Sequence, residues 1–238
     1  KLEFKNNHLR FKKSFERPNL SYSVFNVAAK QNKLLEILQK VNGSGIVYCK
    51  SRKRTKEIAT LLSSNGVNAD FYHAGLGNDL RNTKQQSWIN NKTRVIVCTN
   101  AFGMGIDKPD VRTVVHYDVP DALENYYQEA GRAGRDGLDS DCTSLFSSQD
   151  VQTQRFLIDL SQDETRIPME LEKLQSMIDY CHTEACIQKL IITYCGDLDA
   201  KDCGHCANCT DTRESSEVTT EVQMVLSCVI RMGQRFGK

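Results

Sequence analysis

The sequence predicts an α/β protein, with an open parallel sheet covered by helices on both faces and a small helical, cysteine-rich subdomain after it. Five short apolar runs between residues 45 and 149 are separated by intervals of helix length. After about residue 150 these runs stop and helical periodicity replaces them. Three cysteines then follow with two residues between neighbours, over 203–209, in a stretch too short to fold by apolar burial alone.

The apolar runs are continuous and rich in β-branched residues, which is typical of strands buried on both faces of a parallel sheet. They lie at residues 45–49, 69–72, 95–98, 113–117 and 143–146. Apolar residues at helical spacing are Leu34, Leu35, Leu38 and Val41, and then Ile58, Leu61 and Leu62. This alternation of strand-like and helical stretches predicts the parallel sheet.

Ligands of such sheets bind outside the carboxyl ends of the strands, where the connecting loops gather on one edge. The loops that follow predicted strands start at Lys50, His73, Thr99 and Asp118. We therefore expect the side chains of these loops to share one surface.

The chain after the sheet is predicted to be helical, with a short cysteine segment near its end. Apolar residues at helical spacing are Met169, Leu171, Leu174, Met177 and Ile178, and then Ile187, Leu190, Ile191 and Tyr194. A polar stretch over 210–217 precedes another helical segment from 218. We expect a sheet domain over 1–150, a helical subdomain over 151–212, and a linker with the start of a further domain over 213–238.

Composition excludes several classes of protein. The 238 residues include 31 Lys and Arg against 30 Asp and Glu, so the net charge of +1 excludes a polycationic tail but not a local basic face. A hydrophobic content of 39% argues against disorder, and no apolar run approaches the roughly 20 residues that a bilayer requires. The sequence starts without a signal peptide or an initiator Met. We expect a piece of a longer protein, with no membrane partner.

The chain has ten cysteines, and without a secretory signal a disulfide framework is not expected. The spacing over the cysteine knuckle, residues 203–209, instead suits a tetrahedral zinc ion bound by Cys203, Cys206 and Cys209. A fourth ligand from a helix would complete a structural site; Cys186 is one candidate. The other candidates are Cys181, Cys195, His182 and His205. The alternative interpretation is a group of free thiols or a redox pair.

The arginine loop, residues 128–137, contains two arginines and three glycines. Arg132 and Arg135 are three residues apart, so they project from about the same side of a helical turn. Guanidinium groups bind phosphate oxygens through paired hydrogen bonds, as an arginine finger does. The alternative is a helix C-terminus with a glycine cap and arginines that complement the helix dipole.

Three other loops carry groups suited to phosphate or nucleotide. Thr99–Asp107 follows a strand with a hydroxyl, free backbone N–H groups and a carboxylate. Residues 49–52 lead from a strand into a helix that Ser51 could cap while Arg52 binds a phosphate. Residues 73–75 occupy the equivalent position after the next predicted strand. Each loop alone is as readily a capped helix or an ordinary turn, but all are expected, with the arginine loop, on one edge of the sheet.

Taken together, these loops resemble motifs IV, V and VI in the second RecA-like lobe of superfamily 2 helicases. Within that group the chain resembles the RecQ family. The segments that carry the resemblance are Arg17-Pro18-Asn19-Leu20, Tyr48-Cys49-Lys50-Ser51-Arg52, Ala101 to Pro109, Gln128 to Gly137, the four cysteines 186, 203, 206 and 209, and Gln234-Arg235-Phe236-Gly237. The resemblance selects Cys186 as the fourth metal ligand. It covers essentially the whole chain.

The family implies part of an ATP-dependent 3′–5′ DNA helicase that unwinds duplexes in repair and recombination. The implied catalytic residues are Arg135, Arg132 and Gln128. ATP would be bound by Gly105, Asp107, Arg132 and Arg135, and the DNA backbone by Ser51, Arg52, Gly75, Thr99 and Asn100. A structural Zn²⁺ would be held by Cys186, Cys203, Cys206 and Cys209.

The resemblance also implies partners and a location. ATP and Mg²⁺ would be cofactors of the full-length enzyme, and DNA, as single strands and duplex junctions, its partner. A first RecA-like lobe and a winged-helix domain of the same chain would complete it. The protein would be cytoplasmic, near the nucleoid, in a bacterium or nuclear in a eukaryote.

Two departures limit the resemblance. The sequence holds no phosphate-binding Gly-x-x-x-x-Gly-Lys-Ser/Thr loop and no Asp-Glu-x-His box, so we expect this segment alone to be inactive. After Cys186 the family usually has two arginines, whereas Ile187 and Gln188 stand here. The alternative functions are a non-catalytic nucleic-acid-binding module or scaffold, and an RNA remodeller of the same superfamily.

Overall fold

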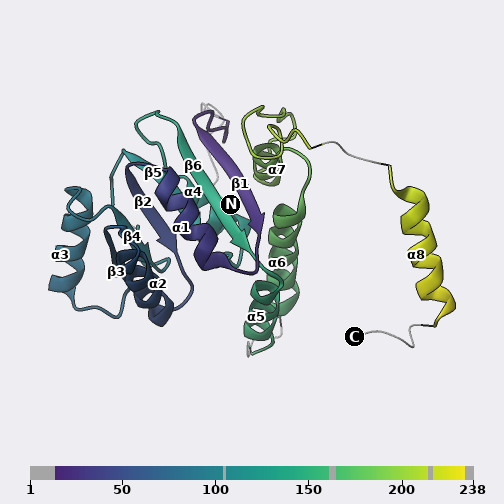
Figure 1. Ribbon diagram of the computed structural model, residues 1–238, viewed down its shortest axis with the longest axis horizontal. Coiled ribbons are helices and arrows are strands. Elements are labelled where there is room, and N and C mark those ends of the chain that lie inside the picture. The colour runs from purple at the N-terminus through teal and green to yellow at the C-terminus, as the bar shows by residue number, and fades with distance from the viewer. Residues whose placement is uncertain (1–13, 104–105, 161–164, 214–216, 234–238) are drawn as a thin grey trace, which may run out of the picture.

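The computed structural model describes residues 14–103, 106–160, 165–213 and 217–233 (Figure 1). Its strands are β1 (Leu20–Asn26), β2 (Ser44–Tyr48), β3 (Ala69–Tyr72), β4 (Val95–Cys98), β5 (Val111–His116) and β6 (Ser140–Phe146). Its helices are α1 (Lys30–Lys40), α2 (Arg52–Ser64), α3 (Asn78–Ile89), α4 (Leu123–Ala130), α5 (Ser148–Asp159), α6 (Ile167–His182), α7 (Ile187–Tyr194) and α8 (Thr219–Arg231).

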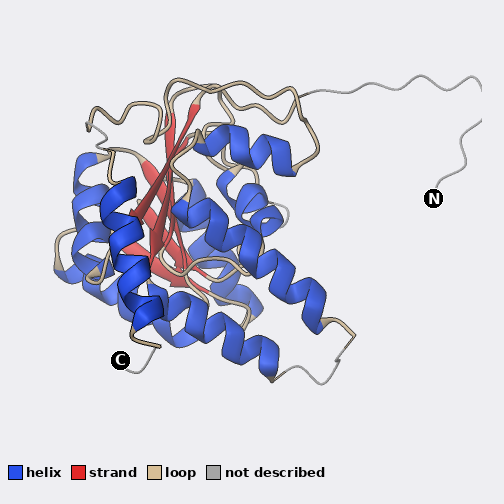
Figure 2. Cartoon of the chain, turned by 90° about the vertical axis from the view of Figure 1, so that its right-hand side faces the viewer, coloured by secondary structure: helices blue, strands red, loops and turns tan. Residues whose placement is uncertain are grey.

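The six strands form one parallel sheet in the order β1-β6-β5-β2-β4-β3. Figure 2 shows this sheet nearly edge-on, with helices on both sides. The predicted fold class is confirmed. The edge strand β1 is absent from the predicted strands because serines interrupt its apolar residues, so no continuous run marks it. Its pairing with β6, more than 110 residues further along the chain, supplies what the local pattern lacks.

Apolar side chains pack on both faces of the sheet, as a buried parallel sheet requires. Along β2, Ile46 and Tyr48 belong to one apolar cluster, and Val47 belongs to the other. The second cluster includes the apolar faces of α1 and α2 through Leu34, Leu38, Ile58 and Leu62. The first cluster includes Trp88 of α3, Tyr126 of α4 and Met177 of α6. Helix α6 therefore shares a core with the sheet.

The cysteine knuckle covers the outer edge of the sheet. The N–H of Ala207 donates to the Tyr22 carbonyl at 2.9 Å, and the Ser21 hydroxyl donates to the His205 carbonyl at 2.9 Å. Nε2 of His205 lies 3.2 Å from the Leu20 carbonyl oxygen. These contacts occupy edge groups of β1 that would otherwise be free to pair with another chain.

Helix α5 joins the sheet to the helical subdomain. Ser147 and Asp150 form a capping box at its start, and the Lys30 ammonium contacts Asp150 at 2.6 Å, which ties α5 to α1. Residue 150, the expected domain boundary, thus lies inside the first turn of α5. No described helix is long and apolar enough to cross a membrane.

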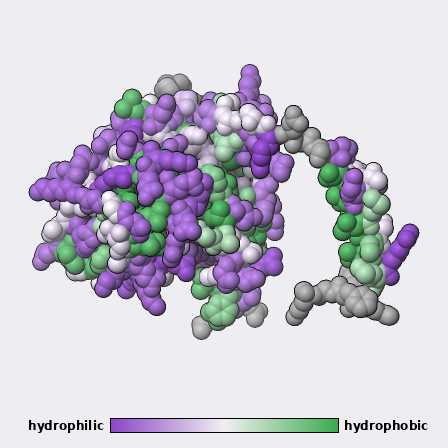
Figure 3. Space-filling view, viewed as in Figure 1, coloured by the Kyte–Doolittle hydropathy of each residue, from purple (hydrophilic) through white to green (hydrophobic). Residues whose placement is uncertain are grey.

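Helix α8, expected from the sequence, lies apart from the other elements in Figure 1, and apolar side chains run along it in Figure 3. All of its residues are exposed.

Candidate functional site

Four loops meet at the carboxyl edge of the sheet. The Cys49 N–H donates to the Cys98 carbonyl at 2.8 Å, and the Thr99 N–H donates to the Tyr72 carbonyl at 3.3 Å. The backbone N–H of Lys50 donates to the Asp118 carboxylate at 2.9 Å. The prediction that the loops starting at Lys50, His73, Thr99 and Asp118 share one surface is therefore confirmed.

Ser51, Arg52 and Gly75 lie together on this edge. Ser51 caps α2, because its hydroxyl accepts from the Arg54 N–H at 3.1 Å. The Arg52 guanidinium lies over Gly75, where a Cβ would come within 2.8 Å of Nη1. All three residues are exposed. The absence of a side chain at residue 75 thus lets Arg52 cross from α2 to the next loop and present its charge at the edge.

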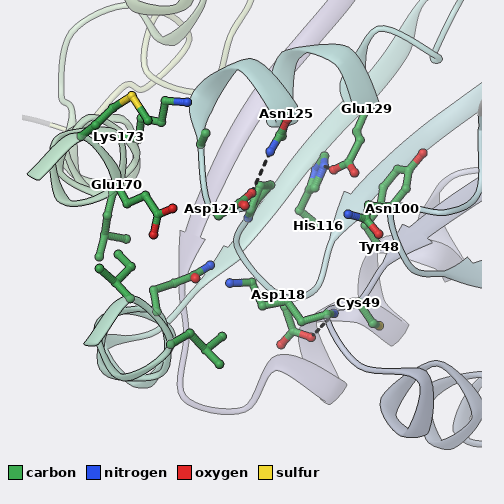
Figure 4. A pocket seen from close by; sticks show the side chains of 18 of the residues that line it. Tyr48, Cys49, Asn100, His116, Asp118, Asp121, Asn125, Glu129, Glu170 and Lys173 are labelled. Carbon is green, nitrogen blue, oxygen red and sulfur yellow. Dashed lines mark hydrogen bonds and ion pairs between the residues drawn. The ribbon is translucent and has the colours of Figure 1, made fainter. Parts of the chain in front are cut away.

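The neighbouring part of the edge is hollowed into a pocket of about 520 Å³ between β2, β5 and helices α4 to α6. Asn100 is exposed and lines the pocket, whereas Thr99 beside it is buried. Figure 4 shows Asn100, His116, Glu129 and Asp118 around this space, with Glu170 and Lys173 across from them. Burial lowers the pKa of Lys50, also in the lining, against the raising effect of nearby Asp121 and Asp118.

Only the start of the arginine loop lies at the carboxyl edge, where Glu129 contacts His116 at 2.9 Å; residues 134–136 lie elsewhere, contrary to the prediction. The Gly134 N–H donates to the carbonyl of Val111, the first residue of β5, at 2.9 Å. The Asp136 N–H donates to the Pro109 carbonyl at 3.2 Å. The physical reason is the length of α4: the loop after β5 continues into this helix, which runs back beside the sheet. The backbone of residues 134–136 therefore lies at the amino end of β5.

Arg132 and Arg135 have different surroundings. The Arg132 guanidinium is half-buried and donates to the Gly103 carbonyl at 2.6 Å, while its Nε has no partner among the described residues. Arg135 is exposed, and its guanidinium lies 3.2 Å from the carboxylate of Asp107, which is itself exposed. Arg132 is thus held by the chain, whereas Arg135 is free to bind a group from outside.

The other residues of the expected nucleotide site are Gln128, Asp107 and Gly105. Gln128 is exposed on α4, one turn before Arg132. Asp107 lies on the loop after β4, which carries it from the carboxyl edge toward the arginines. Gly105 lies outside the described residues. The described loops thus bring Asp107, Arg132 and Arg135 together beside Gly103 of the loop after β4.

Sequence reasoning missed two side chains that hold the arginine loop. The Arg17 guanidinium donates to the carbonyls of Ala133 and Gly134 at 3.0 and 3.2 Å. The Asn19 amide donates to the Gly134 carbonyl at 2.8 Å. Both belong to the Arg17-Pro18-Asn19-Leu20 segment, which carries part of the family resemblance but received no role from the sequence. Spacing alone could not have assigned one, because the segment lies more than 110 residues before the loop.

The structure brings Cys186, Cys203, Cys206 and Cys209 together, with all four Sγ atoms within 4.8 Å of one another. The Sγ atoms of Cys203 and Cys209 are 4.0 Å apart, and those of Cys206 and Cys186 are 3.9 Å apart. Four thiolates about 2.3 Å from a tetrahedral zinc would be separated by roughly 3.8 Å. The spacing of the sulfurs therefore fits a zinc ion.

Backbone donors surround these sulfurs. The N–H groups of Lys189 and Cys203 donate to Cys186 Sγ at 3.4 and 3.3 Å, and the Cys206 N–H donates to Cys203 Sγ at 3.3 Å. Burial opposes ionisation of Cys206, but the N–H groups of Cys209 and Ile187 and the adjacent thiols lower its pKa to about 7. Burial raises the pKa of Cys203 to about 12. Backbone N–H donors of this kind favour the thiolate, the form of cysteine that binds a metal.

The competing ligands lie elsewhere. Nδ1 of His205 is 2.8 Å from the Cys203 carbonyl oxygen, so this ring docks the knuckle on β1. The His182 ring packs edge-on against Phe146 at 4.9 Å. Cys181 is buried, and burial raises its pKa to about 12. Ile187 and Gln188, where the family usually has arginines, are both buried.

Two family models match the chain. The model of the helicase conserved C-terminal domain matches residues 29–137, and that of the RecQ zinc-binding domain matches residues 148–210. The chain is 49% identical over 225 residues to the ATP-dependent DNA helicase RecQ of Bacillus subtilis, an alignment of 94% of this chain and 38% of that protein. It is 39% identical over 249 residues to the RecQ-like DNA helicase blm-1 of Caenorhabditis elegans, with 97% and 25% covered.

Solved structures agree on the fold. A DEAD box protein from the hyperthermophile Methanococcus jannaschii superposes with a TM-score of 0.51 at 27% sequence identity. The superposition covers 59% of this chain and 39% of that one. The sheet and its helices thus have the RecA-like arrangement that the sequence motifs implied.

Proposed function

The chain belongs to the RecQ helicase family, with its conserved C-terminal helicase domain and zinc-binding domain, and we propose that it supplies the arginine finger and DNA-backbone contacts of an ATP-dependent 3′–5′ DNA helicase. The chain spans 38% of the Bacillus subtilis relative. ATP and Mg²⁺ would be bound chiefly by a first RecA-like lobe of the longer protein, because no phosphate-binding loop occurs in this sequence. Unwinding in repair and recombination would be the work of the complete enzyme.

The observation that carries the proposal is the exposed guanidinium of Arg135 beside half-buried Arg132. A guanidinium neutralises charge that develops on a transferred phosphoryl group, and it keeps its own charge at any physiological pH. Among the described residues Arg135 is ion-paired with exposed Asp107 alone, so it can exchange that partner for phosphate at low cost. Asp107 and Gln128 would then couple nucleotide binding to closure of the two lobes.

The carboxyl edge would bind the DNA backbone. Arg52, Gly75 and Ser51 present a cation, an open backbone and a helix N-terminus side by side, which suits phosphate without reading bases. Asn100 extends this surface beside the pocket, with Thr99 behind it. DNA and nucleotide would thus contact different parts of this domain, joined by the loop after β4.

The cysteine cluster would hold a structural Zn²⁺ through Cys186, Cys203, Cys206 and Cys209. Four sulfurs close the coordination shell and leave no position for substrate, so the ion would stabilise the knuckle and take no part in ATP hydrolysis. One zinc per chain is expected by elemental analysis.

The proposal is tested by ATP turnover of the full-length protein with Arg135→Ala and Arg135→Lys. Loss of an arginine finger lowers kcat by about 10³-fold or more, because the transition state loses its charge stabilisation while ATP stays bound elsewhere. The lysine variant keeps a charge without the planar fork and should recover only part of the rate. Unchanged kcat in Arg135→Ala would remove Arg135 from the mechanism.

The same preparations separate the proposal from its alternatives. A non-catalytic module or scaffold predicts no ATP hydrolysis in the full-length wild type under any condition. An RNA remodeller predicts stronger stimulation of hydrolysis by single-stranded RNA than by single-stranded DNA of the same length. Stimulation by DNA, with unwinding of a duplex that carries a 3′ tail but not a 5′ tail, is the expected result.

A further inference from the structure

A buried histidine–glutamate pair lies at the carboxyl end of β5, between the sheet and α4. Nε2 of His116, at the end of β5, lies 2.9 Å from the carboxylate of Glu129 on α4. His116 is fully buried, and the Glu129 side chain is 12% exposed at the pocket. Figure 4 shows the two side chains pointing toward one another beside Tyr48. The pair therefore fastens α4 to the middle of the sheet.

The hydrogen bond between His116 and Glu129 lies close to Arg132 along the chain. Helix α4 ends at Ala130, so Glu129 lies in its last turn and Arg132 follows three residues later. The Arg132 N–H donates to the Glu129 carbonyl at 3.3 Å. A shift of Glu129 would thus be passed directly to the backbone that carries the Arg132 guanidinium.

His116 also contacts, through Tyr48, the loop that accepts the hydrogen bond from the Arg132 guanidinium. Its ring stacks on Tyr48, with centroids 5.2 Å apart and planes 17° apart. The Tyr48 hydroxyl lies 3.4 Å from the carbonyl of Phe102, and the next carbonyl, that of Gly103, accepts from Arg132 at 2.6 Å. One ring therefore supports both the helix that precedes Arg132 and the loop that receives its guanidinium.

Packing alone does not explain a polar pair at this place. Burying a histidine and a carboxylate costs desolvation, and an apolar pair of similar size would fill the same volume at least as favourably. Nδ1 of His116 gains no partner among the described residues, so the ring is not there to satisfy a second group. What the hydrogen bond adds is direction, since it fixes the rotation of the last turn of α4.

We propose that His116 is a positioning residue for Arg132: its hydrogen bond to Glu129 and its stack on Tyr48 keep that guanidinium at the Gly103 carbonyl, ready for nucleotide. The inference rests on the proposed function, together with the role in ATP binding that the family resemblance implies for Arg132. Asn100, from the edge assigned to DNA, lines the same pocket as His116 and Glu129. The DNA bound at that edge and the position of Arg132 would then both involve the His116–Glu129 pair.

The experiment measures DNA-stimulated ATP turnover of the full-length protein with His116→Phe, which keeps the ring stack and loses the hydrogen bond. We expect kcat to fall about 10- to 100-fold, the scale of a misplaced catalytic group, with little change in the KM for ATP. Glu129→Ala should match His116→Phe, whereas Glu129→Gln keeps an acceptor oxygen and should recover most of the rate. The matched control is Thr113→Val, an equally buried change on β5 at a hydroxyl without a partner.

A double-variant comparison tests whether His116 acts through Arg132. In an Arg132→Lys background, His116→Phe should lower kcat no further, because the group it positions is already gone. Wild-type kcat in His116→Phe, an equal further loss in the Arg132→Lys background, or an equal loss in Thr113→Val would each overturn the inference. Absence of DNA-stimulated hydrolysis in the wild type would instead overturn the proposed function.

Discussion

The arginine loop and the cysteine knuckle are both short, glycine-containing segments, but different forces hold them in place. In the arginine loop, Ala130 and Ala133 are fully buried, and Gly134 is hydrogen-bonded to β5. Among residues 203–209 only Cys206 is buried, and the backbone donors of Cys203 and Cys206 point at sulfur. The arginine loop thus buries two alanines in the core of the sheet, whereas the knuckle contributes chiefly its sulfurs to the same apolar cluster.

This difference explains what each segment can do. A loop anchored on a rigid sheet can leave one side chain, Arg135, exposed and still hold its backbone in place. The knuckle has no apolar interior of its own, so the free energy of metal binding becomes its free energy of folding. The arginine loop is suited to a ligand that binds and dissociates, and the knuckle is suited to a permanently bound structural ion.

The largest expected effect comes from removing one sulfur of the knuckle, compared with one sulfur on β6 that contacts the Ala130 carbonyl of the arginine loop at 3.6 Å. Cys206→Ala removes a metal ligand, and structural zinc sites of this kind contribute about 10 kcal/mol or more to the folding of their segment. Cys142→Ala removes a buried sulfur from β6 and should cost about 1 kcal/mol, as small cavities do. Bound zinc and hydrogen–deuterium exchange of the knuckle measure the first effect, and hydrogen–deuterium exchange of β6 measures the second. Zinc and knuckle protection that survive in Cys206→Ala would contradict the comparison.

A smaller effect is expected where the arginine loop meets the loop after β4. Gly103 has φ +132°, and a Cβ there would collide with the Arg132 guanidinium. Gly103→Ala should therefore displace Arg132 and lower kcat of the full-length protein by about 10- to 100-fold. Gly137→Ala carries similar backbone strain at φ +84° but meets no atom, so it isolates the collision. Equal turnover in the two variants would show that the placing of Arg132 is unimportant.

The smallest effect concerns the carboxyl edge. Ser51→Ala removes the N-cap acceptor of α2 and should cost about 1 kcal/mol of unfolding free energy, measured by urea titration. Ser51→Asp keeps a capping oxygen but adds a negative charge where DNA phosphate is proposed to bind. It should retain stability and weaken single-stranded DNA binding, measured by fluorescence anisotropy at fixed salt. Full DNA affinity in Ser51→Asp would remove this residue from the DNA surface.

Much of the fold and part of the site follow from local patterns. Continuous apolar runs place five of the six strands, and helical spacing places α1, α2, α6 and α7, because each pattern reports burial within one element. The three knuckle cysteines are recognisable for the same reason: two intervening residues determine which sulfurs a single turn can bring together. The shared edge of the loops after β2 to β5 follows from parallel pairing alone.

The tertiary structure decided the contacts between segments that are distant in sequence. The length and direction of α4 move residues 134–136 of the arginine loop to the amino end of β5, and no property of the loop itself records this. Arg17, Asn19 and His205 acquire their roles from partners more than 110 residues away. The amino-acid sequence by itself determined which segments form strands, helices and a metal knuckle, since those depend on neighbours a few residues apart. Where Arg132 and Arg135 lie relative to the DNA edge depends on long-range packing, which local periodicity does not encode.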